Sequence, residues 1–168
     1  MTPMGIAASL ADATTWWSAY YSDHQTVSVV IRYLHLAALM VGGGTALAID
    51  RLVLGSARTG TDDRRRAALT AMHGSHAVVV PALVVVAASG VMMAAADWST
   101  FEVSRLFWIK MGSFVLLLLN GAALVAAERA YAKGGDTGMW RRVVAASGAS
   151  FLLWLFILWI GEWLTVAA

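Results

Sequence analysis

The chain contains no cysteine, only two prolines and few charged side chains among its 168 residues. The absence of cysteine excludes disulfide bonds, thiolate metal sites and cysteine-based catalysis. Asp, Glu, Lys and Arg make up 13% of the residues, which is roughly half the fraction found in a soluble domain. Hydrophobic residues make up 60%. This composition favours a membrane protein, and the length favours a single domain, residues 1–168.

The first 26 residues also lack lysine and arginine. A secretory signal peptide begins with a basic region, so we do not expect this segment to be one. It instead gathers aromatic residues in TTWWSAYYSDH, and such side chains concentrate where lipid meets water. We expect residues 4–22 to form a helix or loop on the membrane surface, or a short amphipathic helix docked on the bundle. Residues 1–26 are thus predicted to be an interfacial N-terminal segment.

Four apolar stretches are long enough to cross a bilayer, which takes roughly 20 helical residues. They cover about residues 27–50, 68–96, 103–127 and 143–166. Membrane-spanning strands would need the alternating pattern of a closed barrel, which is missing here. The sequence therefore predicts an all-α integral membrane protein, an antiparallel bundle of four transmembrane helices.

The basic residues fall mainly in two of the connecting loops, 51–66 and 129–142. These loops hold Arg51, Arg58, Arg64, Arg65, Arg66, Arg129, Lys133, Arg141 and Arg142, and only Arg105 lies outside the spans on the other side. The positive-inside rule places both loops in the cytoplasm and both termini outside, in the periplasm if the membrane is a bacterial inner membrane. The cluster TDDRRR has no interleaved aromatic residues, so we expect a lipid bilayer and no nucleic acid as partner.

Polar and small residues recur at steps of three and four within each span, which keeps them on one helical face. We expect these faces to turn toward the bundle interior and away from lipid. At ~1.5 Å per residue they form two layers. The outer layer holds Arg32, His35, Asp97, Lys110 and Glu162, and the inner layer holds Asp50, His73, His76, Asn120 and Glu128.

Pairing the first two spans antiparallel at these depths places His76 across from Gly42–Gly44. It also places His35 across from Leu83, beside Pro81. We expect Pro81 to favour a kink, because proline removes one hydrogen bond of the helix.

His35 and Lys110 are the leading candidate site residues, because an ionisable side chain inside a membrane is by default a candidate for a functional role. The alternative for His35 is a neutral ring that is hydrogen-bonded to a neighbouring helix. Lys110 has two alternatives, an ion pair with Glu162 or Asp97, or extension of its side chain to the outer surface.

The spacing of His73 and His76 can hold one metal ion, with Asp50 or Glu128 completing the site. The alternative is a pair of interface histidines beside acidic residues. Gly42, Gly43 and Gly44 suit close packing of helices, or the approach of a planar ligand.

The stretch RYLHLAALMVGGG resembles the first helix of the CopD-type copper-resistance proteins and of the HemJ-type protoporphyrinogen oxidases. VVVPALVVVAASGVMM is similar to the second helix of the HemJ type, and FWIKMGSFVLLL to its lysine-containing third helix. The resemblance covers about residues 28–120. It implies a four-helix bundle with a haem b or porphyrin site, His35 as an axial ligand and Lys110 as a functional lysine. The chain departs from the HemJ pattern at TALAIDRLVL, which lacks its proline and histidine, and Asn120 lies where a third-helix histidine often occurs.

Three functions remain open at this point, and no catalytic residue is assigned. The first is a redox protein that binds b-type haem, with His35 and His76 as histidine ligands. Arg32 and Lys110 would lie near the haem propionates, and Gly43 would line the haem pocket. One iron needs its two axial ligands about 4 Å apart, whereas our depth estimate separates these two histidines.

The second function is the handling of copper or another metal, by His35 with Met111 or by His73 with His76. The third is that of an accessory subunit in a larger membrane complex. A membrane redox partner would belong to the first function.

Overall fold

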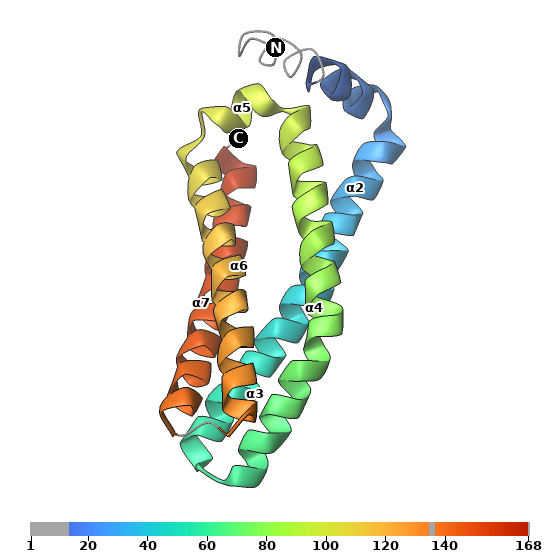
Figure 1. Ribbon diagram of the computed structural model, residues 1–168. Helices are drawn as coiled ribbons and strands as arrows, with labels where there is room; N and C mark the ends of the chain where they lie inside the picture. Colours follow the sequence, from blue (N-terminus) through green and yellow to red (C-terminus); the bar gives the residue numbers. More distant parts are fainter. Residues whose placement is uncertain (1–13, 135–136, 168) are drawn as a thin grey trace, which may run out of the picture.

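The structure, a computed structural model, describes residues 14–134 and 137–167, and all of its regular elements in these ranges are helices (Figure 1). A helix over residues 14–23 precedes the labelled elements. These are α2 (Gln25–Ala38), the π-helix η1 (Leu39–Gly43), α3 (Gly44–Thr59), α4 (Asp62–Ala96), α5 (Trp98–Glu102), α6 (Arg105–Ala132) and α7 (Thr137–Ala167).

Four helical segments are long and apolar enough to cross a bilayer, which confirms the predicted fold class. They are Gln25–Arg58, which combines α2, η1 and α3, and Asp62–Ala96, Arg105–Ala132 and Thr137–Val166. The turn from α3 to α4, the end of α6 and the start of α7 lie at one end, which we call the basic end. Residues 14–23, α5 and the end of α7 lie at the other, which we call the terminal end (Figure 1).

The turn between the first two spans is much shorter than the predicted loop 51–66. α3 continues to Thr59 and is closed by Gly60, whose φ of 69° is left-handed and suits glycine. Thr61 is extended, and Asp62 and Asp63 occupy the first turn of α4, where the helix dipole favours acidic side chains. The arginines of this region therefore lie on helices. α6 likewise extends through Arg129, because charged side chains at a helix end reach the surface without ending the helix.

This short turn changes the predicted pairing of the first two spans. His35 lies against Ser89 where Leu83 was predicted, and Gly42 lies against Ala82 where His76 was predicted. The predicted register was therefore wrong by six positions. The main cause is the predicted end of the first span at residue 50, since α3 continues to Thr59 and the turn lies later in the sequence than assumed.

The irregularity within the spans also falls elsewhere than predicted. α4 continues as a helix through Pro81, whose side chain is exposed. The first span instead contains η1, whose segment LMVGG ends at the second of the three glycines. Thr45 donates a hydrogen bond of 2.7 Å to the carbonyl of Val41, which satisfies one backbone group of this wide turn.

The helix over residues 14–23 is docked on the bundle. Nε1 of Trp17 donates a hydrogen bond of 2.7 Å to the carbonyl of Met92, near the end of α4. Trp16 and Tyr20 stack with ring centroids 5.5 Å apart. Of the two predictions for residues 4–22, a helix docked on the bundle therefore holds for residues 14–22. Residues 4–13 lie outside the described residues.

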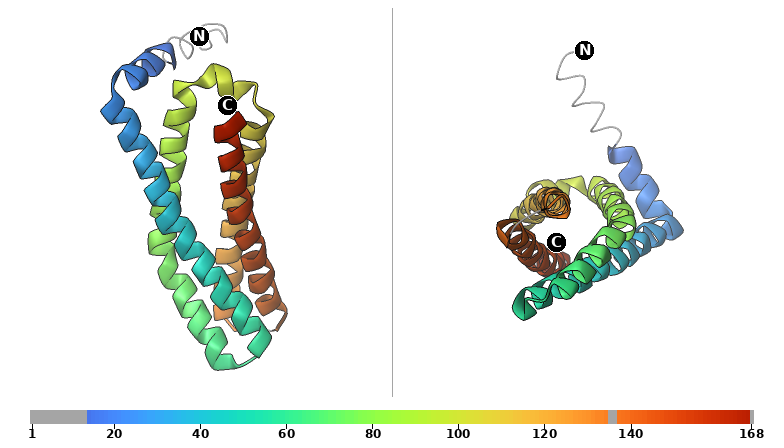
Figure 2. Two further views of the ribbon diagram at one scale, coloured as in Figure 1. Left: turned by 180° about the vertical axis from the view of Figure 1, so that it is seen from behind. Right: turned by 60° about the horizontal axis from the view of Figure 1, so that its bottom comes forward.

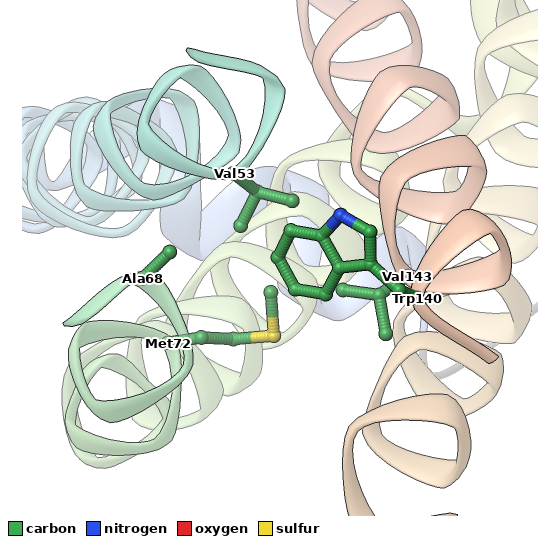
Figure 3. Close-up of a cluster of buried hydrophobic side chains, with 5 residues drawn as sticks. All are labelled: Val53, Ala68, Met72, Trp140 and Val143. Carbon is green, nitrogen blue, oxygen red and sulfur yellow. The ribbon is translucent and has the colours of Figure 1, made fainter. Parts of the chain in front are cut away.

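The four spans form two hairpins that join mainly through one helix pair. α2, η1 and α3 pack along α4, α6 packs along α7, and α3 packs against α7. At the basic end the hairpins meet in a core that we call the basal cluster, made of Val53, Ala68, Met72, Trp140 and Val143 (Figure 3). Toward the terminal end the ribbons of α4 and α6 stand apart (Figures 1 and 2). The hairpins are thus joined at the basic end and, farther along the spans, through a second cluster built on Leu117, Trp154 and Ile157.

Candidate intramembrane site

His35 lies on α2 and is held by a hydroxyl of α4. Its Nδ1 atom is 2.9 Å from Oγ of Ser89. That Oγ also bonds the carbonyl oxygens of Val85 and Val86, the usual way for a helical serine to use its hydroxyl proton. The Ser89 oxygen then accepts the hydrogen bond from Nδ1–H of His35. Because a neutral imidazole carries one N–H, this arrangement leaves a lone pair on Nε2.

The backbone of Gly90 packs against the His35 ring. A Cβ atom built on Gly90 would lie 3.4 Å from Cε1 and 3.9 Å from Nδ1 of His35. The ring therefore rests directly on the backbone of α4. Ser89 was not selected from the sequence as a site residue. The available signal was a lone hydroxyl in an apolar run.

Lys110 approaches the same interior region from the other hairpin. It is half-buried on α6, and its Nζ atom lies 3.3 Å from the position that a Cβ of Gly161 on α7 would take. Lys110 lies near enough to His35 for the two charges to interact. Lys110 forms no ion pair within the described ranges. The pairs considered from the sequence, with Glu162 or Asp97, do not form, and both acidic side chains are exposed.

Arg32 lies near the surface at the terminal end, one turn from His35. Its Nε atom donates a hydrogen bond of 3.3 Å to the hydroxyl of Tyr21. Arg32 and Asp97 both line a pocket of about 780 Å³ between residues 14–23, α2 and the end of α4. The predicted outer layer is therefore divided. His35 and Lys110 lie between the helices, whereas Arg32, Asp97 and Glu162 are exposed.

His73 and His76 lie in the basic half and are bound to a buried acid. Nδ1 of His73 is 3.2 Å from Oε1 of Glu128, and Nε2 of His76 is 3.5 Å from Oε2. Glu128 is 6% exposed, so this contact joins α4 to α6 inside the bundle. Across residues 14–134 and 137–167, no group of three or more His, Asp or Glu side chains is arranged to hold a metal ion. The contact fits the alternative of histidines beside an acid.

His35 and His76 do not lie at one level of the bundle. His35 is level with Ser89, and Ser89 and His76 are 13 residues apart along α4, which corresponds to ~20 Å. Two axial ligands of one iron lie about 4 Å apart. The structure therefore does not bring these two histidines together around one metal.

Gly43 packs against another helix. A Cβ atom on Gly43 would lie 3.1 Å from Cζ3 of Trp154, which is itself buried on α7. The helix-packing interpretation of the glycines therefore describes Gly42 and Gly43. Gly44 differs from both, because a Cβ atom there would meet nothing within 4 Å.

Compared with protein-family models, curated proteins and solved structures, the chain matches none of them.

Proposed function

We propose that the chain is a small integral membrane protein that binds b-type haem, or a related porphyrin, through His35 and serves a redox role. The observation that supports this function is the hydrogen bond between Nδ1 of His35 and Ser89. Histidines that bind a metal almost always donate their second N–H to a neighbouring oxygen, which fixes the tautomer and aims the free nitrogen. His35 has this arrangement, and its Nε2 atom is the nitrogen that would bind iron.

Lys110 supports a ligand that carries negative charge. An ammonium group between apolar helices is costly unless an anion accompanies it, and Lys110 has no anionic partner among the residues that the structure describes. A porphyrin with carboxylate side chains supplies such a partner. Lys110 would hold one propionate between the helices, and Arg32 would lie near a second one at the terminal end. When bound, the haem iron supplies one-electron chemistry.

In this proposal His35 is the histidine ligand, and His73 and His76 take no part. Both are engaged by Glu128 in the other half of the bundle. Gly43 supports the fold through Trp154 and does not face the ligand.

We also propose the orientation that the basic residues favour. Nine lysines and arginines lie at the basic end, against Arg105 outside the spans at the terminal end. The basic end would then face the cytoplasm of a bacterial inner membrane, and the terminal end the periplasm. A redox partner, in the membrane or in a larger complex, would reach the haem edge from the terminal end.

The test is the haem content of the full chain, purified from haem-supplemented cells and measured as the pyridine haemochrome. We expect haem in the unmodified protein and in His76→Ala, its loss in His35→Ala, and weaker retention in Lys110→Met. An unmodified protein without a Soret band, or His35→Ala with full haem content, would overturn the proposal. Copper that is bound without haem and is lost in His35→Ala would also overturn it, in favour of metal handling.

A further inference from the structure

A second polar site lies deeper in the bundle, where Asp50 of α3 faces α7. Asp50 is 2% exposed, and Ser147 and Ser150 of α7 are 0% and 7% exposed. Both hydroxyls lie beside the carboxylate. Within the described ranges, however, Oδ2 of Asp50 and Oγ of Ser147 each lack a hydrogen-bond partner. Two buried oxygen atoms on neighbouring helices thus have unused hydrogen-bonding capacity at the same place.

The side chain of Ser147 behaves differently from those of other helical serines in this chain. Ser56, Ser75 and Ser113 each donate a hydrogen bond to a carbonyl of their own helix, at 2.7 to 2.8 Å. This is the usual way for a buried serine to satisfy its hydroxyl inside a helix. Ser147 is fully buried but does not donate a hydrogen bond to a carbonyl of α7. Its hydroxyl is therefore left to interact with the neighbouring Asp50 carboxylate and with a group bound between α3 and α7.

Among residues 14–134 and 137–167, no side chain forms an ion pair with the Asp50 carboxylate. The titratable groups nearest in level on the neighbouring helices are His73 and His76 of α4 and Glu128 of α6, which are bound to one another. From α7, Ser147 and Ser150 lie against the carboxylate. A buried carboxylate without a neutralising partner is strongly disfavoured, so the fold implies a bound positive charge.

We propose that Asp50, Ser147 and Ser150 form an intramembrane site for a small monovalent cation, either a proton or Na⁺. Carboxylate and hydroxyl oxygens are the ligands that hard cations prefer, and the absence of nitrogen and sulfur ligands argues against a transition metal. The carboxylate supplies the compensating charge, and the serine oxygens supply neutral contacts. The site lies about 20 Å along the first span from His35, so it does not depend on haem binding.

Apolar side chains close the site toward both ends of the bundle. Val53 and Val143 lie one helical turn beyond Asp50 and Ser147 toward the basic end, and both are fully buried. Trp140 and Met72 fill the space between them (Figure 3). This apolar layer separates the site from the basic end. On the terminal side of the site a second apolar cluster, built on Leu117, Trp154 and Ile157, also fills the space between the hairpins.

Infrared difference spectroscopy of the full chain against Asp50→Asn tests the proposal, in Na⁺-free and Na⁺-containing buffers. A carbonyl band of a protonated acid that is lost in Asp50→Asn, and does not respond to Na⁺, assigns the proton. A carboxylate band that shifts with Na⁺ but not with a bulky organic cation assigns Na⁺. A carboxylate band of Asp50 that ignores Na⁺ overturns the site.

A second comparison keeps the test valid if Asp50→Asn fails to fold. Ser147→Ala should shift the Asp50 band, and Asp50→Glu then identifies that band by moving it. Ser113→Ala is the matched control, because Ser113 is also buried but bonds its own helix. An Asp50 band that is identical in Ser147→Ala and in the unmodified protein would exclude the shared site. Haem content should stay unchanged in Ser147→Ala and Asp50→Asn, which separates this test from that of His35.

Discussion

His35 and Ser89 lie 54 residues apart in the sequence, yet Nδ1 of the histidine is 2.9 Å from Oγ of the serine. The contact joins α2 to α4 in the terminal half of the bundle. Ser89 also bonds the carbonyls of Val85 and Val86 on its own helix, and with its proton used there its oxygen accepts from the ring. The histidine is thereby fixed with Nε2 free, and this relationship can be tested separately from the histidine itself.

Replacing Ser89 by alanine should weaken haem binding without removing the ligand. The His35 ring would lose the acceptor that orients it, and the loss of such a partner typically lowers metal affinity about 10-fold or more. Haem titration of the purified protein measures the effect. Ser75→Ala is the matched control, since Ser75 lies on α4 but bonds only its own helix. Equal haem affinity in Ser89→Ala and Ser75→Ala would contradict the positioning role of Ser89.

The glycines of the first span should respond unequally to alanine. A Cβ atom on Gly42 would lie 2.5 Å from Cβ of Ala82, whereas one on Gly44 would meet nothing within 4 Å. Gly42→Ala should therefore lower the unfolding free energy by about 1–3 kcal/mol, the usual cost of overpacking. Gly44→Ala should be neutral or slightly stabilising. Thermal unfolding in detergent compares them. Adding Ala82→Gly to Gly42→Ala should restore stability, and no rescue would show that the register is wrong.

Glu128 should stabilise the packing of α6 against α4 through its contacts with His73 and His76. Glu128→Ala leaves His76 without its acidic partner inside the bundle, and should cost about 1 kcal/mol or more in unfolding free energy. His76→Ala should cost more than His73→Ala, because the side chain of His73 is 87% exposed and its pair is better screened. Glu162→Gln serves as the control, since that side chain is exposed and in no ion pair among the described residues. Equal stability of the two glutamate variants would show that the contacts of Glu128 do not stabilise the fold.

Trp17 should hold the N-terminal helix against α4. Trp17→Phe keeps most of the ring but removes the donor to the Met92 carbonyl, which should cost about 1 kcal/mol of docking free energy. Amide hydrogen exchange over residues 14–23 should then become faster. Trp16→Phe should change little, because Trp16 is 66% exposed. Exchange that increases equally in both variants would mean that the hydrogen bond is not what docks the helix.

Much of the fold follows from the sequence, because four long apolar runs leave few alternatives inside a bilayer. The pairing of the first two helices did not follow. Charged residues such as Arg51 and Arg64 are poor markers of helix ends, since long side chains reach the surface from the last turns of a helix. Gly60 was the better signal, because a left-handed residue ends the helix there.

The site was predictable in its residue types but not in its contacts. The positions of His35 and Lys110 inside apolar runs were sufficient to select them. Their partners depend on register, and an error of six positions replaced Ser89 by Leu83. The π-helix at Leu39–Gly43 added a further change of helical phase that no spacing rule indicated. The facing of Asp50 and Ser147 arises from tertiary packing of α3 against α7, which local sequence does not specify.

Rescue of His35→Gly by imidazole tests the central claim most directly. If Nε2 of His35 binds the haem iron, the glycine variant should lack the Soret band of the unmodified protein. Free imidazole should then restore that band with its original shape. A His76→Gly variant should need no rescue. An unaltered Soret band in His35→Gly without imidazole would contradict the account.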